Sequence, residues 1–75
     1  MIIRAEWPGY VVDVLVGVGQ EVEEDEALVL MEGTDSGHTP FYANATDSGK
    51  IKQILIEEGD YVEEDDDLIE VGDSD

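Results

Sequence analysis

The chain has 75 residues, and its 21 Asp and Glu side chains against three Lys and Arg give a formal net charge of −18. This length supports one small domain over residues 1–75 and leaves no room for a second. The absence of cysteine excludes a disulfide framework and a zinc–thiolate site. The shortage of cations argues against direct binding to nucleic acid or to an anionic membrane, because phosphate contacts require Lys and Arg.

The negative charge also predicts a dependence on salt. Neighbouring carboxylates repel one another across a Debye length of about 10 Å in ordinary buffer and about 3 Å near 1 M salt. We therefore expect a protein of a salt-loaded cytoplasm, such as that of a halophilic archaeon, which needs high K⁺ for stability. The alternative is an acidic protein of an ordinary cell. The sequence shows neither a signal-peptide-like start nor an apolar run of membrane-spanning length, so we expect a cytoplasmic location.

Short apolar segments between turn residues predict strands, and no segment repeats its apolar residues with a helical period. We predict a first strand over residues 2–6, a turn at Pro8-Gly9 and a second strand over 11–16, where β-branched residues are frequent. The alternation of apolar and polar residues fails across 14–16. This failure predicts either a bulge or a strand end that is buried on both faces.

The middle of the chain predicts a β-hairpin. The apolar segments 27–30 and 41–45 are each long enough for one strand, and the polar residues between them include Gly33 and Gly37. A Gly-rich polar connection between two strands is typical of a hairpin, and this connection is longer than the tight two-residue turn.

The segment 9–25 recurs as 49–65, with a constant offset of 40 residues and no gap. The identical pairs include Gly9/Gly49, Leu15/Leu55, Gly19/Gly59, Val22/Val62, Glu23/Glu63, Glu24/Glu64, Asp25/Asp65 and Leu28/Leu68. The repeat predicts two similar halves related by a pseudo-two-fold axis. Within them we expect glycine turns, single buried valines, acidic surface turns, and core residues at 28–29 and 68–69. The predicted fold is an all-β sandwich or flattened barrel with a core over about 2–71 and a frayed tail at 72–75.

Several motifs together resemble the biotinyl/lipoyl attachment domain family. Trp7-Pro8-Gly9 followed by a Val-rich strand is similar to the opening of that family, and the segments 14–22 and 54–62 resemble its strand with the following Gly-Asp-x-Val signature. Ala45-Thr46-Asp47-Ser48-Gly49 resembles the exit from its carrier hairpin. The resemblance covers about residues 5–72. It implies two four-stranded sheets in a flattened barrel, with the tip of the central hairpin exposed at one end.

The chain departs from the family at the hairpin tip, where a carrier domain holds the lysine that receives biotin or lipoate. The corresponding residues, called the tip loop below, are Gly33, Thr34, Asp35, Ser36, Gly37 and His38. Depending on the residue from which one counts, Ser36, Asp35 or His38 occupies the place of the lysine. Lys50 and Lys52 follow the outgoing strand, too far along the chain to stand at the tip. The usual amide linkage is therefore excluded, and we expect no cofactor.

These observations predict a non-enzymatic interaction module that docks onto an unknown protein partner through the tip loop. The alternative is a carrier subunit of a biotin- or lipoate-dependent complex with an unconventional attachment, for instance an ester on Ser36. A third possibility is a hydrolase that uses Asp35, Ser36 and His38. An exposed loop gives those residues neither rigid support nor an oxyanion hole. His38 also lacks the additional nitrogen or sulfur ligands of a transition-metal site, so we expect no metal.

The aromatic residues divide between packing and exposure. Phe41 and Tyr42 are consecutive on the predicted strand, so one ring should face the core and the other the solvent. The exposed ring is a candidate anchor for a partner, because aromatic residues are enriched at interface hot spots. For Trp7 and for the other ring we expect packing within the barrel.

Overall fold

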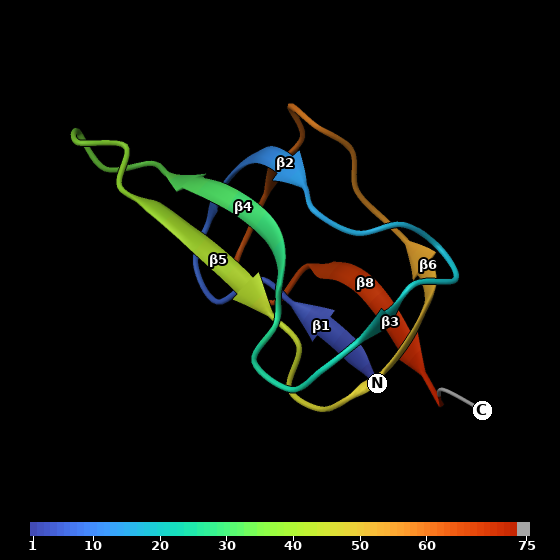
Figure 1. Cartoon of the computed structure of the whole chain (residues 1–75). Helices are drawn as coiled ribbons and strands as arrows, with labels where there is room; N and C mark the ends of the chain where they lie inside the picture. The colour runs from blue at the N-terminus through green and yellow to red at the C-terminus, as the bar shows by residue number, and fades with distance from the viewer. Residues whose placement is uncertain (74–75) are drawn as a thin grey trace.

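The computed structural model describes residues 1–73, which form eight strands and contain no helix that could cross a membrane. The strands are β1 (Ile2–Arg4), β2 (Gly9–Val14), β3 (Glu21–Val22), β4 (Ala27–Gly33), β5 (Pro40–Asn44), β6 (Gly49–Ile54), β7 (Tyr61–Val62) and β8 (Asp67–Gly72). They pair antiparallel into two four-stranded sheets, ordered β5-β4-β2-β7 and β1-β8-β6-β3 (Figure 1). We call the first the hairpin sheet and the other the second sheet. The predicted all-β fold with two four-stranded sheets is confirmed.

The two halves of the chain repeat each other at the level of single hydrogen bonds. The amide of Gly19 donates to the carbonyl of Ile51 at 2.8 Å, and that of Gly59 donates to the carbonyl of Val11 at the same distance. Both glycines have a φ of 90°, in the left-handed region that glycine adopts without a steric penalty. The predicted glycine turns therefore also link the halves, because each turn donates to a strand of the other half.

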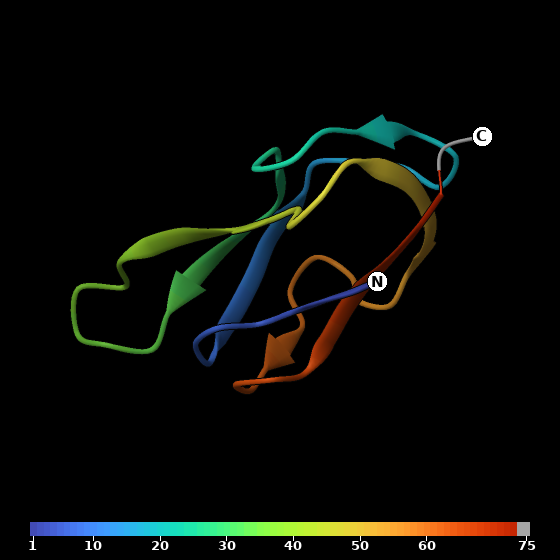
Figure 2. The same ribbon diagram turned by 90° about the horizontal axis from the view of Figure 1, so that it is seen from below.

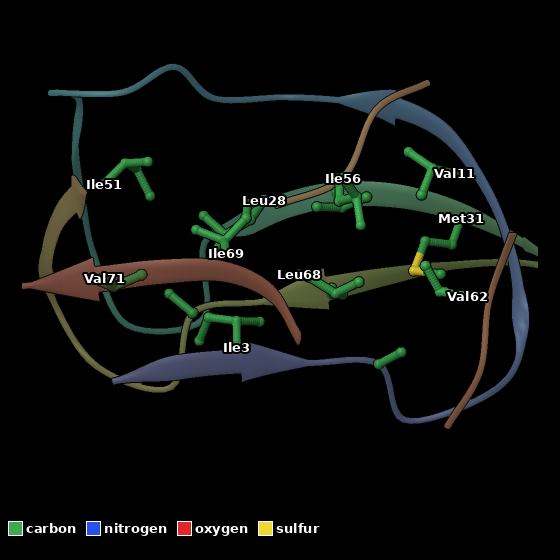
Figure 3. Packing of buried hydrophobic residues seen from close by; sticks show 14 of the residues in the cluster. Ile3, Val11, Leu28, Met31, Ile51, Ile56, Val62, Leu68, Ile69 and Val71 are labelled. Carbon is green, nitrogen blue, oxygen red and sulfur yellow. The ribbon is translucent and has the colours of Figure 1, made fainter. Parts of the chain in front are cut away.

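The core lies between the sheets and is lined by equivalent residues from both halves (Figure 3). Leu28 and Leu68 are fully buried, and so are the residues that follow them, Val29 and Ile69. Val22 and Val62, in the shortest strands, are buried as well. These residues confirm the predicted core, and no polar side chain is buried among residues 1–73. Such a core relies on apolar burial alone.

The structure corrects the predicted position of the strand irregularity. The register of β2 with β4 passes from Val11 to Asp13 and skips Val12, and the register of β6 with β8 skips the equivalent residue, Lys52. The bulge therefore lies at residue 12, upstream of 14–16. Leu15 points outward and is 42% exposed, so the alternation does continue there. This alternation could not be recognised from the sequence, because residues 14–16 are all apolar.

The ends of the chain also differ from expectation. β1 stops at Arg4 instead of residue 6. β8 includes Gly72, which pairs with Lys50, so the tail is ordered one residue further than predicted. The N-terminal ammonium donates to the carbonyl of Val71 at 2.6 Å, and the start of the chain therefore lies beside β8 (Figure 2). Residues 74–75 of the predicted frayed tail lie outside the described residues.

Candidate functional site at the hairpin tip

The central hairpin is formed by β4 and β5, whose register runs to Glu32 opposite Pro40. The amide of Gly33 then donates to the carbonyl of Thr39 at 2.9 Å, which closes the connection 34–39. This connection projects from one end of the elongated molecule (Figure 1). The predicted hairpin with an exposed tip and a connection longer than two residues is confirmed.

The side chain of Asp35 forms hydrogen bonds across the tip loop. Its carboxylate accepts two hydrogen bonds from Thr39, at 3.1 Å from the backbone amide and at 2.9 Å from the hydroxyl. The backbone bond first, and then the hydroxyl bond, lower the pKa of the Asp35 carboxyl below its usual value, because both stabilise the ionised form. The side chain is therefore engaged in shaping the connection.

His38 turns back toward β4. It has a φ of 47°, an uncommon conformation for a residue other than glycine, and its amide donates to the carbonyl of Asp35 at 3.0 Å. Its Nδ1 atom lies 3.6 Å from Oε1 of Glu32, an arrangement that becomes an ion pair when the imidazole is protonated. This geometry directs the imidazole toward Glu32 on β4.

Two of the three residues that have the side-chain types of a hydrolase triad thus contact other residues. The carboxylate of Asp35 is taken by Thr39, and the imidazole of His38 is directed to Glu32. Ser36 is exposed between them. Within residues 1–73, no three His, Cys, Asp or Glu side chains are grouped as metal ligands. The arrangement presents a shaped, exposed loop surface.

The prediction for Trp7 was wrong. We expected it to pack within the barrel, but its side chain is 60% exposed in the turn between β1 and β2. The internal repeat contained the missed signal, because the equivalent residue of the other half is Asp47, a solvent residue. Tyr42 is 56% exposed, whereas Phe41 packs against the core, which confirms their predicted division.

Trp7 belongs to an open groove of about 360 Å³ at the base of the tip loop. The lining residues are Trp7, Pro8, Gly33, Thr34, Asp35, Thr39 and Phe41. Gly9 brings the two walls together, because a Cβ atom at this position would lie 2.5 Å from the carbonyl oxygen of Glu32. The groove therefore joins an exposed indole to the tip loop.

The two lysines lie away from this site, as predicted. Both are in β6 of the second sheet, where Lys50 pairs with Glu21. The side chain of Lys52 extends over Gly72, so closely that a Cβ atom there would lie 2.5 Å from its Cε atom. Neither amine belongs to the tip loop or to the groove.

No family model and no curated protein sequence matches the chain, but solved structures do. The urea carboxylase of Kluyveromyces lactis matches 96% of this chain with 28% identity and a TM-score of 0.87. A single-chain, multi-domain long-chain acyl-CoA carboxylase matches 92% of it with 25% identity and a TM-score of 0.81. The match spans 6% of each of those two chains. The lipoyl domain of the 2-oxoglutarate dehydrogenase complex from Azotobacter vinelandii matches over 97% of this chain and 99% of that domain, with 22% identity and a TM-score of 0.72.

These likenesses confirm the resemblance found in the sequence. The chain has the fold of the biotinyl/lipoyl attachment domain family. The tip loop of this chain contains no lysine, and the exposed side chain of Trp7 lies beside it.

Proposed function

We propose that this chain is a non-enzymatic protein-interaction module, which docks onto a partner protein through the tip loop and the adjoining groove. It does not carry biotin or lipoate in the usual amide linkage. The observation that carries this proposal is the exposure of Trp7 beside a tip loop that contains no lysine. A large exposed indole is costly in water and is a frequent hot-spot residue in interfaces.

The geometry of the groove supports the docking of a partner protein better than it supports catalysis. Its apolar walls, Trp7, Pro8 and Phe41, offer contact area, while the Asp35–Thr39 hydrogen bonds hold the opposite rim in one shape. A preformed surface loses less conformational entropy on binding than a flexible loop does. A cytoplasm of high salt also favours apolar contacts over long-range charge attraction, since salt screens exposed charges.

A crosslinking experiment tests this proposal. Because the chain has no cysteine, Ser36→Cys creates a single thiol at the tip for a benzophenone reagent, and Ser48→Cys places the same thiol on an exposed turn of the other half as a control. We expect a defined partner to be crosslinked from position 36 and not from 48, and Trp7→Asp to abolish that product. Equal labelling from both positions, or a product that persists with Trp7→Asp, would contradict docking at the tip.

The alternative, a carrier with an ester on Ser36, is separated by intact mass. Ser36 is exposed on the projecting connection, so a transferase could reach its hydroxyl. Protein purified from its native host under denaturing conditions should have the mass of its unmodified polypeptide, with no group added at Ser36. A covalent adduct that disappears with Ser36→Ala would replace the docking proposal by a carrier with a new attachment chemistry.

A further inference from the structure

The outer face of the hairpin sheet carries all three tyrosines of the chain. Tyr10 lies opposite Tyr61 on one side and Glu32 on the other, and Leu30 lies opposite Tyr42. Residues directly opposite on neighbouring strands share a face, so these side chains form one surface. We call Tyr10, Leu30, Tyr42 and Tyr61 the aromatic face. The rings of Tyr10 and Tyr61 meet edge to face with centroids 5.2 Å apart, and each of these tyrosines is 48% exposed.

The second sheet provides an internal comparison, because the pseudo-two-fold maps every position of the aromatic face onto it. The equivalent residues are Lys50, Glu70, Ile2 and Glu21, with the same pairings, Glu21 opposite Lys50 and Ile2 opposite Glu70. The same fold therefore accepts charged side chains at three of these four positions. Packing does not demand tyrosines there, and exposed tyrosines are characteristic of recognition surfaces.

Charge is distributed unevenly between the two sheets. All three cations lie on the second sheet, with Arg4 in β1 and Lys50 and Lys52 in β6, and Arg4 is paired with Asp67 at 3.0 Å. The charged residues paired with the aromatic face are both acidic, Glu32 opposite Tyr10 and Asp13 opposite Leu30, and the strands of its sheet contain no Lys or Arg. A second copy of the chain would bring another −18 charge to this surface, and like charges repel.

We propose that the aromatic face is a second docking surface, separate from the tip loop, and that it binds a protein surface rich in arginine and lysine. The cations of the partner lie over the faces of the tyrosine rings, and one of them pairs with the carboxylate of Glu32. Cation–π attraction acts at short range and survives salt that screens distant charges. Arginine suits this surface best, because its planar guanidinium can stack on a ring and hydrogen-bond a carboxylate.

The test uses the whole chain, ¹⁵N-labelled, and a short peptide of alternating arginine and leucine, in about 1 M KCl, where the Debye length is only about 3 Å. The matched probe replaces each arginine with glutamine. We expect the arginine peptide to shift amide resonances of β2, β4, β5 and β7, and the glutamine peptide to shift none. The double variant Tyr10→Ser/Tyr61→Ser should weaken binding about tenfold, whereas Tyr10→Phe/Tyr61→Phe, which keeps both rings, should bind as the parent does.

Val18→Ser serves as a control, because it removes a side chain that is 67% exposed on a turn away from the aromatic face and should leave binding unchanged. Shifts confined to the acidic turns, or binding that the Ser variants do not weaken, would show general attraction to carboxylates and overturn the proposal. Failure of the arginine peptide to shift any resonance would also overturn it. A self-association that Tyr10→Ser/Tyr61→Ser abolishes would replace the basic partner with a second copy. Amide shifts limited to the tip loop would overturn the proposal of a second docking surface and would agree with docking at the tip loop alone.

Discussion

The hydroxyl of Thr39 donates to Oδ2 of Asp35 at 2.9 Å while the amide of the same residue donates to Oδ1 at 3.1 Å. Thr39 ends the connection 34–39, so this pair joins the two sides of the tip. Both donors favour an ionised carboxylate, which is why the pKa of Asp35 is lowered. The shape of the tip is therefore linked to the charge of one side chain.

Thr39→Val should raise the pKa of Asp35 toward its usual value, because it removes the hydroxyl donor and leaves the amide donor. Carboxyl ¹³C NMR titration measures this pKa directly. Thr46→Val is the control, since the Thr46 hydroxyl contacts the sulfur of Met1 and no carboxylate. An unchanged pKa in Thr39→Val would mean that the hydroxyl bond does not form in solution.

The same pair predicts how the tip responds to pH. The pKa of Asp35 is lower in the folded chain than in the unfolded one, so its contribution is complete above the unfolded value and is lost as the pH falls through the folded value. We expect the amide resonance of Thr39 to move with a midpoint below the usual aspartate range. Asp35→Asn should abolish that movement, and its persistence in the variant would assign it to another group.

Gly9→Ala and Gly49→Ala should each destabilise the barrel. A Cβ atom would lie 2.5 Å from the carbonyl oxygen of Glu32 in the first case and 2.4 Å from that of Gly72 in the second. Overpacking of this kind costs about 1–3 kcal/mol of the free energy of unfolding. Gly17→Ala is the matched control, because nothing lies within 4 Å of its Cβ position. Urea unfolding monitored by circular dichroism should separate the first two variants from the third.

Leu28→Ala and Leu68→Ala should cost similar amounts of stability. Both side chains are fully buried at equivalent positions, and such truncations cost about 2–5 kcal/mol. In so small a domain, each variant should be largely unfolded without stabilising salt. Leu15→Ala, at a residue that is 42% exposed, should unfold close to the parent. A large difference between the two core variants would show that the halves are energetically unequal.

The stability of the chain should rise with KCl concentration. Residues 63–67 are all acidic, and the whole chain carries a net charge of −18, so the compact state concentrates like charges. Circular dichroism in a KCl titration should show folding that increases with salt. Glu64→Lys should shift the transition to lower salt, because it breaks this run of carboxylates. Full folding without salt would contradict the expected adaptation to a salt-loaded cytoplasm.

Local pattern and internal repetition determined most of the fold. The offset of 40 residues placed Val22 with Val62 and Leu28 with Leu68, and each pair is buried in the structure. Such inferences succeed because a buried position needs an apolar residue in both copies, whatever its neighbours are. The absence of lysine from the tip loop was likewise readable from the sequence, since it is a matter of composition and position alone.

Only the tertiary structure decided which exposed residues come together. Tyr10 and Tyr61 are 51 positions apart in the printed sequence, and they meet because β7 crosses from the other half to pair with β2. The position of Trp7 beside the tip loop depends in the same way on the approach of its turn to the hairpin. A sequence pattern reports whether a residue faces the core. It does not report which distant strand lies beside that residue, because strand register is set by packing of the whole barrel.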